Sequence, residues 1–191
     1  MMKKIIVAVG VTASFIAGYF LSEYLDSRTN QRLSLELAIR GTQELEGKNY
    51  NESLRNLFTA LYFNPDNRLA HQGLGYFFYK QGLNDLALKE FENFVESPKD
   101  VLLEKIGGGK LHIDVAMGYC YLADLYEKKG EKEMMVKNFQ RAVNEFPELP
   151  QYLLNHIKLI VEKKEKNADD SQMLRLYSQF YDNVKTLRKK N

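Results

Sequence analysis

A recurring spacing of small and aromatic residues constrains the fold of this chain more than any other feature. Three positions return after the same 48 residues: Gly75 as Ala123, Gly82 as Gly130, and Phe91 as Phe139. Gly41 stands 34 residues before Gly75 and opens a weaker copy. The apolar residues within each copy follow the 3.6-residue period of helices, and each copy ends at a proline, which cannot continue a helix. Because a lone helical pair cannot bury its apolar face, the spacing predicts several stacked pairs.

This spacing resembles the tetratricopeptide repeat (TPR), whose 34-residue unit reads aromatic-x2-Leu-Gly-x2-aromatic, then Ala-x3-Phe, then Pro. Residues 68–98 follow the pattern with His71, Leu74, Gly75, Phe78, Ala87, Phe91 and Pro98. Residues 116–147 follow it with Tyr119, Leu122, Ala123, Tyr126, Met135, Phe139 and Pro147. Residues 34–65 follow it more weakly, because Arg40 and Glu44 replace the expected Leu and aromatic. The small residues are expected where the two helices of a unit cross, and Phe91 and Phe139 between neighbouring units.

We therefore expect an all-α chain: an α-solenoid of three TPR-like helical hairpins plus a C-terminal capping helix pair, preceded by one N-terminal transmembrane helix. The expected segments are a cytoplasmic N-terminus (1–4), a transmembrane signal anchor (5–25), a linker (26–33), the weak first repeat (34–67), the second repeat (68–98), an insert loop (99–115), the third repeat (116–148), a degenerate fourth pair or cap (149–187) and a basic tail (188–191). The insert allows two structures: a mobile loop, or a small hairpin of 101–106 against 110–115.

The N-terminal segment is apolar and long enough to cross a bilayer. Residues 5–21 carry no charge, and continuing to Leu25 gives a helix of about 31 Å, which matches the hydrocarbon core. Two lysines precede the run and two acids follow it, so the positive-inside rule predicts a single-pass inner-membrane protein with a cytoplasmic N-terminus and a periplasmic, or otherwise extracytoplasmic, TPR domain. A cleaved signal peptide is the alternative; it is disfavoured because bulky Phe15 stands three residues before a cut after Ala17.

Small residues recur every fourth position within this segment, at Gly10, Ser14 and Gly18. That spacing gives a flat face that lets another helix approach closely, so these residues are candidates for transmembrane packing. The alternative is the ordinary abundance of small residues in membrane helices.

Composition and motifs argue against catalysis. The formal net charge of +2 and the lack of a basic, aromatic-rich stripe predict no nucleic-acid partner. Three scattered histidines and the single Cys120 have no metal-ligand spacing, and Cys120 is expected to be a buried thiol. The sequence GGGK before Leu111 lacks the Ser or Thr of a phosphate-binding loop. We expect no enzyme activity, no cofactor, no metal and no small-molecule substrate.

The resemblance to TPR proteins implies a concave groove lined by the first helix of each unit. Its protein-binding positions are Thr42 in the first unit, Leu69, Gln72, Tyr76 and Tyr79 in the second, and Met117, Asp124 and Glu127 in the third. Such a groove is apolar at one end, aromatic at the centre and acidic at the other. Tyr76 and Tyr79 are its natural anchors, because Tyr offers a large contact area at low entropic cost; the alternative is that both only cover the inner wall.

The expected function is that of a membrane-anchored TPR scaffold, which mediates protein–protein interactions in the assembly of an extracytoplasmic (cell-envelope) complex. Its expected partners are other proteins or extended peptide segments, the membrane, and a partner transmembrane helix. The alternative is a permanent structural or accessory subunit of a membrane complex, which packs through its transmembrane helix.

Overall fold

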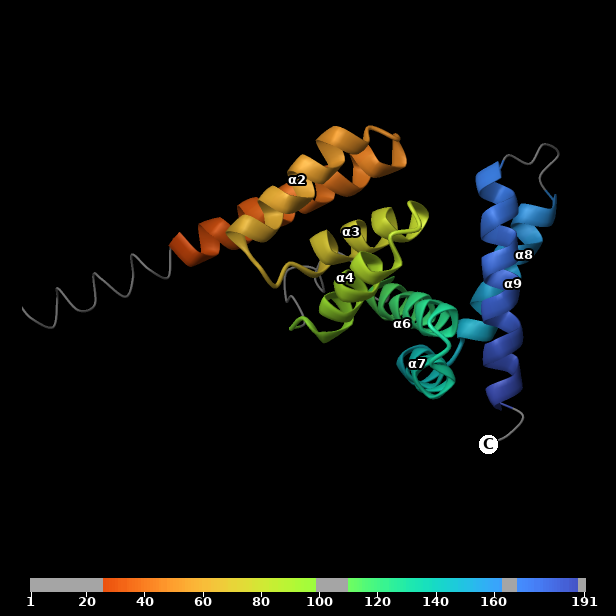
Figure 1. The fold of residues 1–191 in the computed structure, drawn as a ribbon. Coiled ribbons are helices and arrows are strands. Elements are labelled where there is room, and N and C mark those ends of the chain that lie inside the picture. Colours follow the sequence, from red (N-terminus) through yellow and green to blue (C-terminus); the bar gives the residue numbers. More distant parts are fainter. Residues whose placement is uncertain (1–25, 99–109, 163–167, 189–191) are drawn as a thin grey trace, which may run out of the picture. The chain divides into compact units, whose positions relative to one another are not determined.

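The computed structural model describes residues 26–98, 110–162 and 168–188, and every regular element in these ranges is an α-helix (Figure 1). The expected all-α class is confirmed for these residues. The chain divides into two compact units, Met1–Gly73 and Leu74–Asn191, with the division inside α3 (Arg68–Lys80). The expected transmembrane segment 5–25 lies outside the described residues, and none of the helices that are described is long and apolar enough to cross a membrane.

The first unit is built on an antiparallel pair, the helix over 26–46 and α2 (Tyr50–Phe63). Side-chain hydroxyls tie the two helices together: Ser53 Oγ donates to the Gly41 carbonyl at 2.8 Å, and Ser34 Oγ donates to the Ala60 carbonyl at 2.7 Å. Leu57 is fully buried, and a Cβ added to Gly41 would lie 2.7 Å from Leu57 Cγ. Residues 26–33, the expected linker, are helical and continue directly into the first repeat.

Asn67 fixes the start of α3 within the first unit. Its Oδ1 accepts a hydrogen bond from the Ala70 backbone N–H at 3.0 Å, which caps the helix, and its Nδ2 donates to Ser34 Oγ at 2.7 Å. His71 is buried, with Nε2 at 2.8 Å from the Pro65 carbonyl oxygen, and this agrees with the packing position expected for it.

The second unit contains the end of α3 followed by α4 (Asn84–Glu96), α6 (Lys110–Lys128), α7 (Lys132–Glu145), α8 (Leu149–Glu162) and α9 (Ala168–Arg188). Its core is aromatic, with four phenylalanines at most 1% exposed: Phe91, Phe94, Phe139 and Phe180. Glycines let these rings approach neighbouring helices, because a Cβ on Gly75 would lie 3.0 Å from Phe91 and one on Gly118 would lie 2.6 Å from Phe94. Gly75 thus lies where α3 and α4 of the second expected repeat approach each other, as predicted. Phe91 packs on Gly75 within that repeat and also stacks on Tyr121 of α6.

The three expected hairpins share one turn geometry. Lys48, Gly82 and Gly130, spaced by 34 and 48 residues, have φ values of 61°, 71° and 79°. The residue after each has φ between −86° and −83° and ψ between 66° and 70°. The second helices end at Phe63, Glu96 and Glu145, each two residues before a proline, as expected because the residue before proline avoids helical geometry.

The structure contradicts the hairpin alternative for the insert. Residues 110–115 are the first turns of α6 rather than a strand, while 99–109 lie outside the described residues. Two observations favour the longer helix: Val115 is 5% exposed, and His112 Nδ1 lies 2.7 Å from Glu145 Oε1 at the end of α7. Polar and apolar residues alternate over 110–115, which suggests a strand, but these residues form the start of a helix.

The C-terminal pair does more than cap the last hairpin. Helices α8 and α9 lie side by side (Figure 1). In the sequence, an apolar stripe at helical spacing predicts one buried face, made of Met173, Leu176, Tyr177, Phe180, Val184 and Leu187. Leu176, Phe180 and Val184 are buried as this stripe predicts. The Phe180 ring also reaches α6, with its centroid 5.8 Å from that of Tyr121. Helix α9 therefore covers part of the face that was expected to be open.

Lys48→Gly is expected to stabilise the first unit by about 1 kcal/mol. The left-handed backbone conformation costs free energy for Lys, whereas Gly adopts it without a steric penalty. Gly82→Lys is the reciprocal control and is expected to destabilise by a similar amount; no atom lies within 4 Å of its added Cβ, so only the backbone changes. Urea unfolding of the full chain in detergent measures both. A loss of stability in Lys48→Gly would contradict the shared turn geometry.

Candidate functional site

A cleft of about 260 Å³ opens in the second unit where α3, α6 and α9 meet. The side chains that line it are Tyr76, Tyr79 and Lys80 of α3, Tyr121, Asp124 and Lys128 of α6, and Gln172, Met173, Arg175, Leu176 and Gln179 of α9. Tyrosine rings form one wall, and charged side chains surround them. The cleft thus combines apolar contact area with polar groups, as sites for ligands or peptide segments commonly do.

Tyr121 is the centre of the aromatic wall. It stacks on Phe91 with ring centroids 4.9 Å apart and planes at 4°, and it meets Tyr79 edge-on at 5.0 Å and Tyr76 edge-on at 6.2 Å. Edge-to-face and offset contacts at these distances are favourable beyond the area they bury. The position of the two α3 tyrosines is therefore set by the core ring beneath them.

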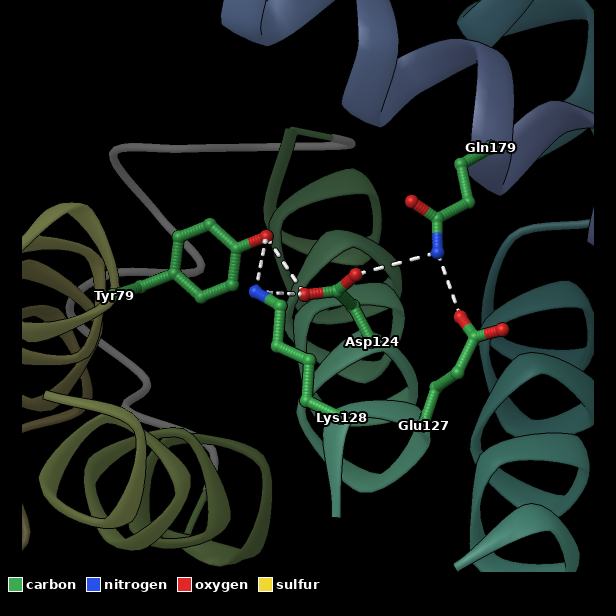
Figure 2. A network of polar contacts seen from close by, with 5 residues as sticks. All are labelled: Tyr79, Asp124, Glu127, Lys128 and Gln179. Atoms are coloured by element: carbon green, nitrogen blue, oxygen red, sulfur yellow. Dashed lines mark hydrogen bonds and ion pairs between the residues drawn. The ribbon is translucent and has the colours of Figure 1, made fainter. Parts of the chain in front are cut away.

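A polar network joins the three helices across the cleft (Figure 2). The Tyr79 hydroxyl donates to Asp124 Oδ2 at 2.7 Å, and Lys128 Nζ lies 2.7 Å from the same oxygen. From α9, Gln179 Nε2 donates to Glu127 Oε2 at 2.6 Å and to Asp124 Oδ1 at 3.4 Å. Asp124 is only 4% exposed, and these contacts supply the partners that a buried carboxylate requires.

The network changes the electrostatics expected from the sequence. Asp124 and Glu127 were expected to form an acidic end of an open groove, but both carboxylates are bound by neighbours within the unit. The cleft lining instead contains three cations, Lys80, Lys128 and Arg175, against the single carboxylate of Asp124. The balance of formal charge at the cleft is therefore positive.

Burial sets the protonation state of the groups in this region. Desolvation, reinforced by the adjacent Asp124 carboxylate, raises the pKa of the Tyr79 hydroxyl far above its ordinary value. Burial likewise raises the pKa of Tyr121 and of the Cys120 thiol. Cys120 is fully buried, as expected, and stays a neutral thiol that is a poor nucleophile.

The residues predicted to bind partners fall into two groups. Tyr76, Tyr79 and Asp124 line the cleft. Glu127 does not line it but accepts a hydrogen bond from Gln179, which does. Met117 is 8% exposed and belongs to the core. Thr42, Leu69 and Gln72 belong to the first unit, where all three are partly buried, and the Thr42 hydroxyl donates to the Ile39 carbonyl at 2.8 Å. Gly10, Ser14 and Gly18 lie outside the described residues.

Sequence reasoning missed the cleft residues Tyr121, Lys128, Arg175 and Gln179. A signal existed for Lys128, which stands four residues after Asp124 on the same helix, a spacing at which opposite charges meet. No comparable signal marks Arg175 or Gln179, because their place depends on how α9 packs across α6.

Among the residues described, no group of three or more His, Cys, Asp or Glu side chains is arranged to hold a metal ion. No family model and no curated protein matches the sequence. The resemblance to TPR proteins therefore stays a prediction, supported by the repeated spacing and the turns.

Asp124→Asn is expected to lower the unfolding free energy by about 1–3 kcal/mol, because Asp124 is buried and its carboxylate accepts charge-assisted hydrogen bonds from Tyr79 and from the half-exposed Lys128. The matched control is Asp85→Asn, which removes the 3.4 Å pair between Lys129 and a side chain that is 89% exposed. That control is expected to leave stability unchanged within error. Equal effects of the two substitutions in urea unfolding would contradict the role given to the network.

Stability is expected to fall as the pH rises above about 10, where tyrosines of the unfolded chain ionise. Tyr79, Tyr121 and Tyr177 have raised pKa values when folded, so each contributes stability that is complete below pH 10 and is lost above it, at up to about 1.4 kcal/mol per pH unit. Tyr79→Phe is expected to weaken this dependence when unfolding free energies are compared between neutral and alkaline pH. An unchanged slope would contradict the buried, neutral state of Tyr79.

Proposed function

We propose that this chain is a membrane-anchored TPR scaffold that holds other proteins during assembly of an extracytoplasmic, cell-envelope complex. The observation that carries the proposal is the cleft of the second unit, where rigid tyrosine rings stand beside three cationic side chains. Such a surface is suited to gripping a protein segment.

The repeat assignment is supported by features that recur at 34- and 48-residue intervals. The turns at Lys48, Gly82 and Gly130 have matching backbone angles, and each second helix stops two residues before a proline. In the second unit, Gly75 and Phe91 pack as a TPR unit requires of its small and aromatic positions. A generic bundle has no physical reason to repeat these details at the same intervals.

The chemistry of the cleft favours a partner segment that carries a carboxylate next to an apolar or aromatic side chain. An apolar side chain buries area against Tyr76 and Tyr121, while a carboxylate approaches the cations Lys80 and Arg175. Charge complementarity of this kind contributes to specificity and to the rate of encounter. Nothing in this arrangement requires that the bound segment be chemically changed, so the proposal is for binding without catalysis.

The membrane anchor of the proposal is supported by the sequence of residues 5–25. Tethering at the bilayer raises the effective concentration of the cleft for partners in the same membrane, which increases avidity without any added contact. A scaffold of modest intrinsic affinity therefore becomes effective when it is anchored.

A photo-crosslinking amino acid in place of Tyr76 is expected to capture a defined partner in intact cells, and one in place of Leu86 is not. Leu86 is the matched control because it is 47% exposed on α4 and does not line the cleft. Arg175→Glu is expected to reduce the capture strongly, because it reverses one of the charges that attract the partner. Mass spectrometry of the adducts identifies the partner. Capture of the same proteins at position 86, or no effect of Arg175→Glu, would contradict the proposal.

A further inference from the structure

Helix α2 presents two aromatic side chains to solvent. Phe58 is 51% exposed and Tyr62 is 82% exposed, whereas Leu57 and Ala60 on the inner face of the same helix are fully buried. Residues four apart on a helix share a face, so the two rings form one aromatic face, defined here by Phe58 and Tyr62. A single exposed aromatic residue is ordinary, so a function for this face has to be inferred from where the face lies in the first unit.

The aromatic face lies toward the end of the first unit at which the described chain begins. Because α2 is antiparallel to the helix over 26–46, with Ser34 bonded to Ala60, its last residues return to the first turns of that helix. A polar cleft of about 430 Å³ marks this end, and it is lined by Asp26, Ser27, Asn30, Gln31, Phe63 and Asn64. Tyr62 directly precedes two of these residues.

The proposed function places a bilayer next to this end of the first unit. Residues 5–25 form the apolar run that the proposed function places across a bilayer, so Asp26 would leave the hydrocarbon core at its surface. Tyr62 of α2 lies near the level of Arg32 in the first helix. Arg32 follows Asp26 by six residues, which is about 9 Å along the helix axis. The headgroup layer is about 5–8 Å thick on each side, and membrane helices tilt by about 20° on average. This height is just beyond the headgroup layer, so the Tyr62 ring reaches the headgroups when the first helix tilts toward α2.

We infer that the aromatic face of α2 docks on the headgroup layer of the bilayer that residues 5–25 enter. The inference rests on the anchor of the proposed function. Tyrosine is enriched at membrane interfaces because its ring is apolar and its hydroxyl is polar, and the side chains of Asn30, Gln31 and Asn64 offer hydrogen-bonding groups beside it. The contact orients the first unit on the membrane surface in addition to the covalent tether.

The chain has no tryptophan, so single substitutions report depth without background. Tyr62→Trp is the probe, Phe58→Trp tests the same face one turn away, and Tyr50→Trp is the matched control at the far end of α2, about 18 Å from position 62. Each full-length variant is reconstituted into phosphatidylcholine vesicles, with and without lipids that carry a quencher at shallow depth. Flotation measures insertion in the same samples.

The expected result is flotation of all three variants, with a blue shift and loss of fluorescence at position 62, a smaller loss at 58, and neither at 50. Flotation without quenching at 62, or with equal quenching at 62 and 50, would overturn the docking and leave the anchor intact. Failure to float would overturn the anchor and the docking that rests on it, while the cleft at Tyr76 would still be judged by its own crosslinks. A melting curve of each variant shows that the first unit is folded.

Discussion

The close approach of helices at glycine is the constraint on which the rest of the structure depends. Three glycines each pack directly against a large side chain: Gly41 against Leu57, Gly75 against Phe91, and Gly118 against Phe94. A Cβ added to any of them would lie 2.6–3.0 Å from that side chain. Interiors are packed like crystals, so a side chain at any of these positions would push the helices apart. In the second unit, the position of Phe91 then sets that of Tyr121, and Tyr121 forms the wall of the cleft.

Helix α9 determines the character of the cleft more than the repeats do. It packs Phe180 against Tyr121, and its Gln179 donates hydrogen bonds to both Asp124 and Glu127. These two carboxylates, which the repeat pattern places in an open groove, therefore have partners within the unit. It also contributes Arg175 to the lining. The excess positive charge of the lining comes from all three helices, with Lys80 on α3, Lys128 on α6 and Arg175 on α9.

Much of the local structure could be predicted from the sequence, because it follows from the helical period of the apolar residues and from the positions of glycine and proline. The pairs around Gly75 and Phe91, the helix ends before Pro65, Pro98 and Pro147, and the apolar stripe of α9 were all expected. The extended start of α6 was not, because alternation over 110–115 fits a strand as well as one face of a helix. The left-handed turn at Lys48 was also hidden, since that position is not a glycine and only the matching geometry of Gly82 and Gly130 reveals it.

The sequence by itself determined that the described residues form helices, where those helices pair, and which small residues lie where the helices of a pair approach each other. These features depend on contacts between residues close along the chain, whose spacing carries the information. Only the tertiary structure decided that Gln179 meets Asp124 and Glu127, 55 and 52 residues away, and that Arg175 joins the cleft. No periodic relation links α9 to α6, so their contact follows from the shape of the whole apolar core, which sequence spacing does not encode.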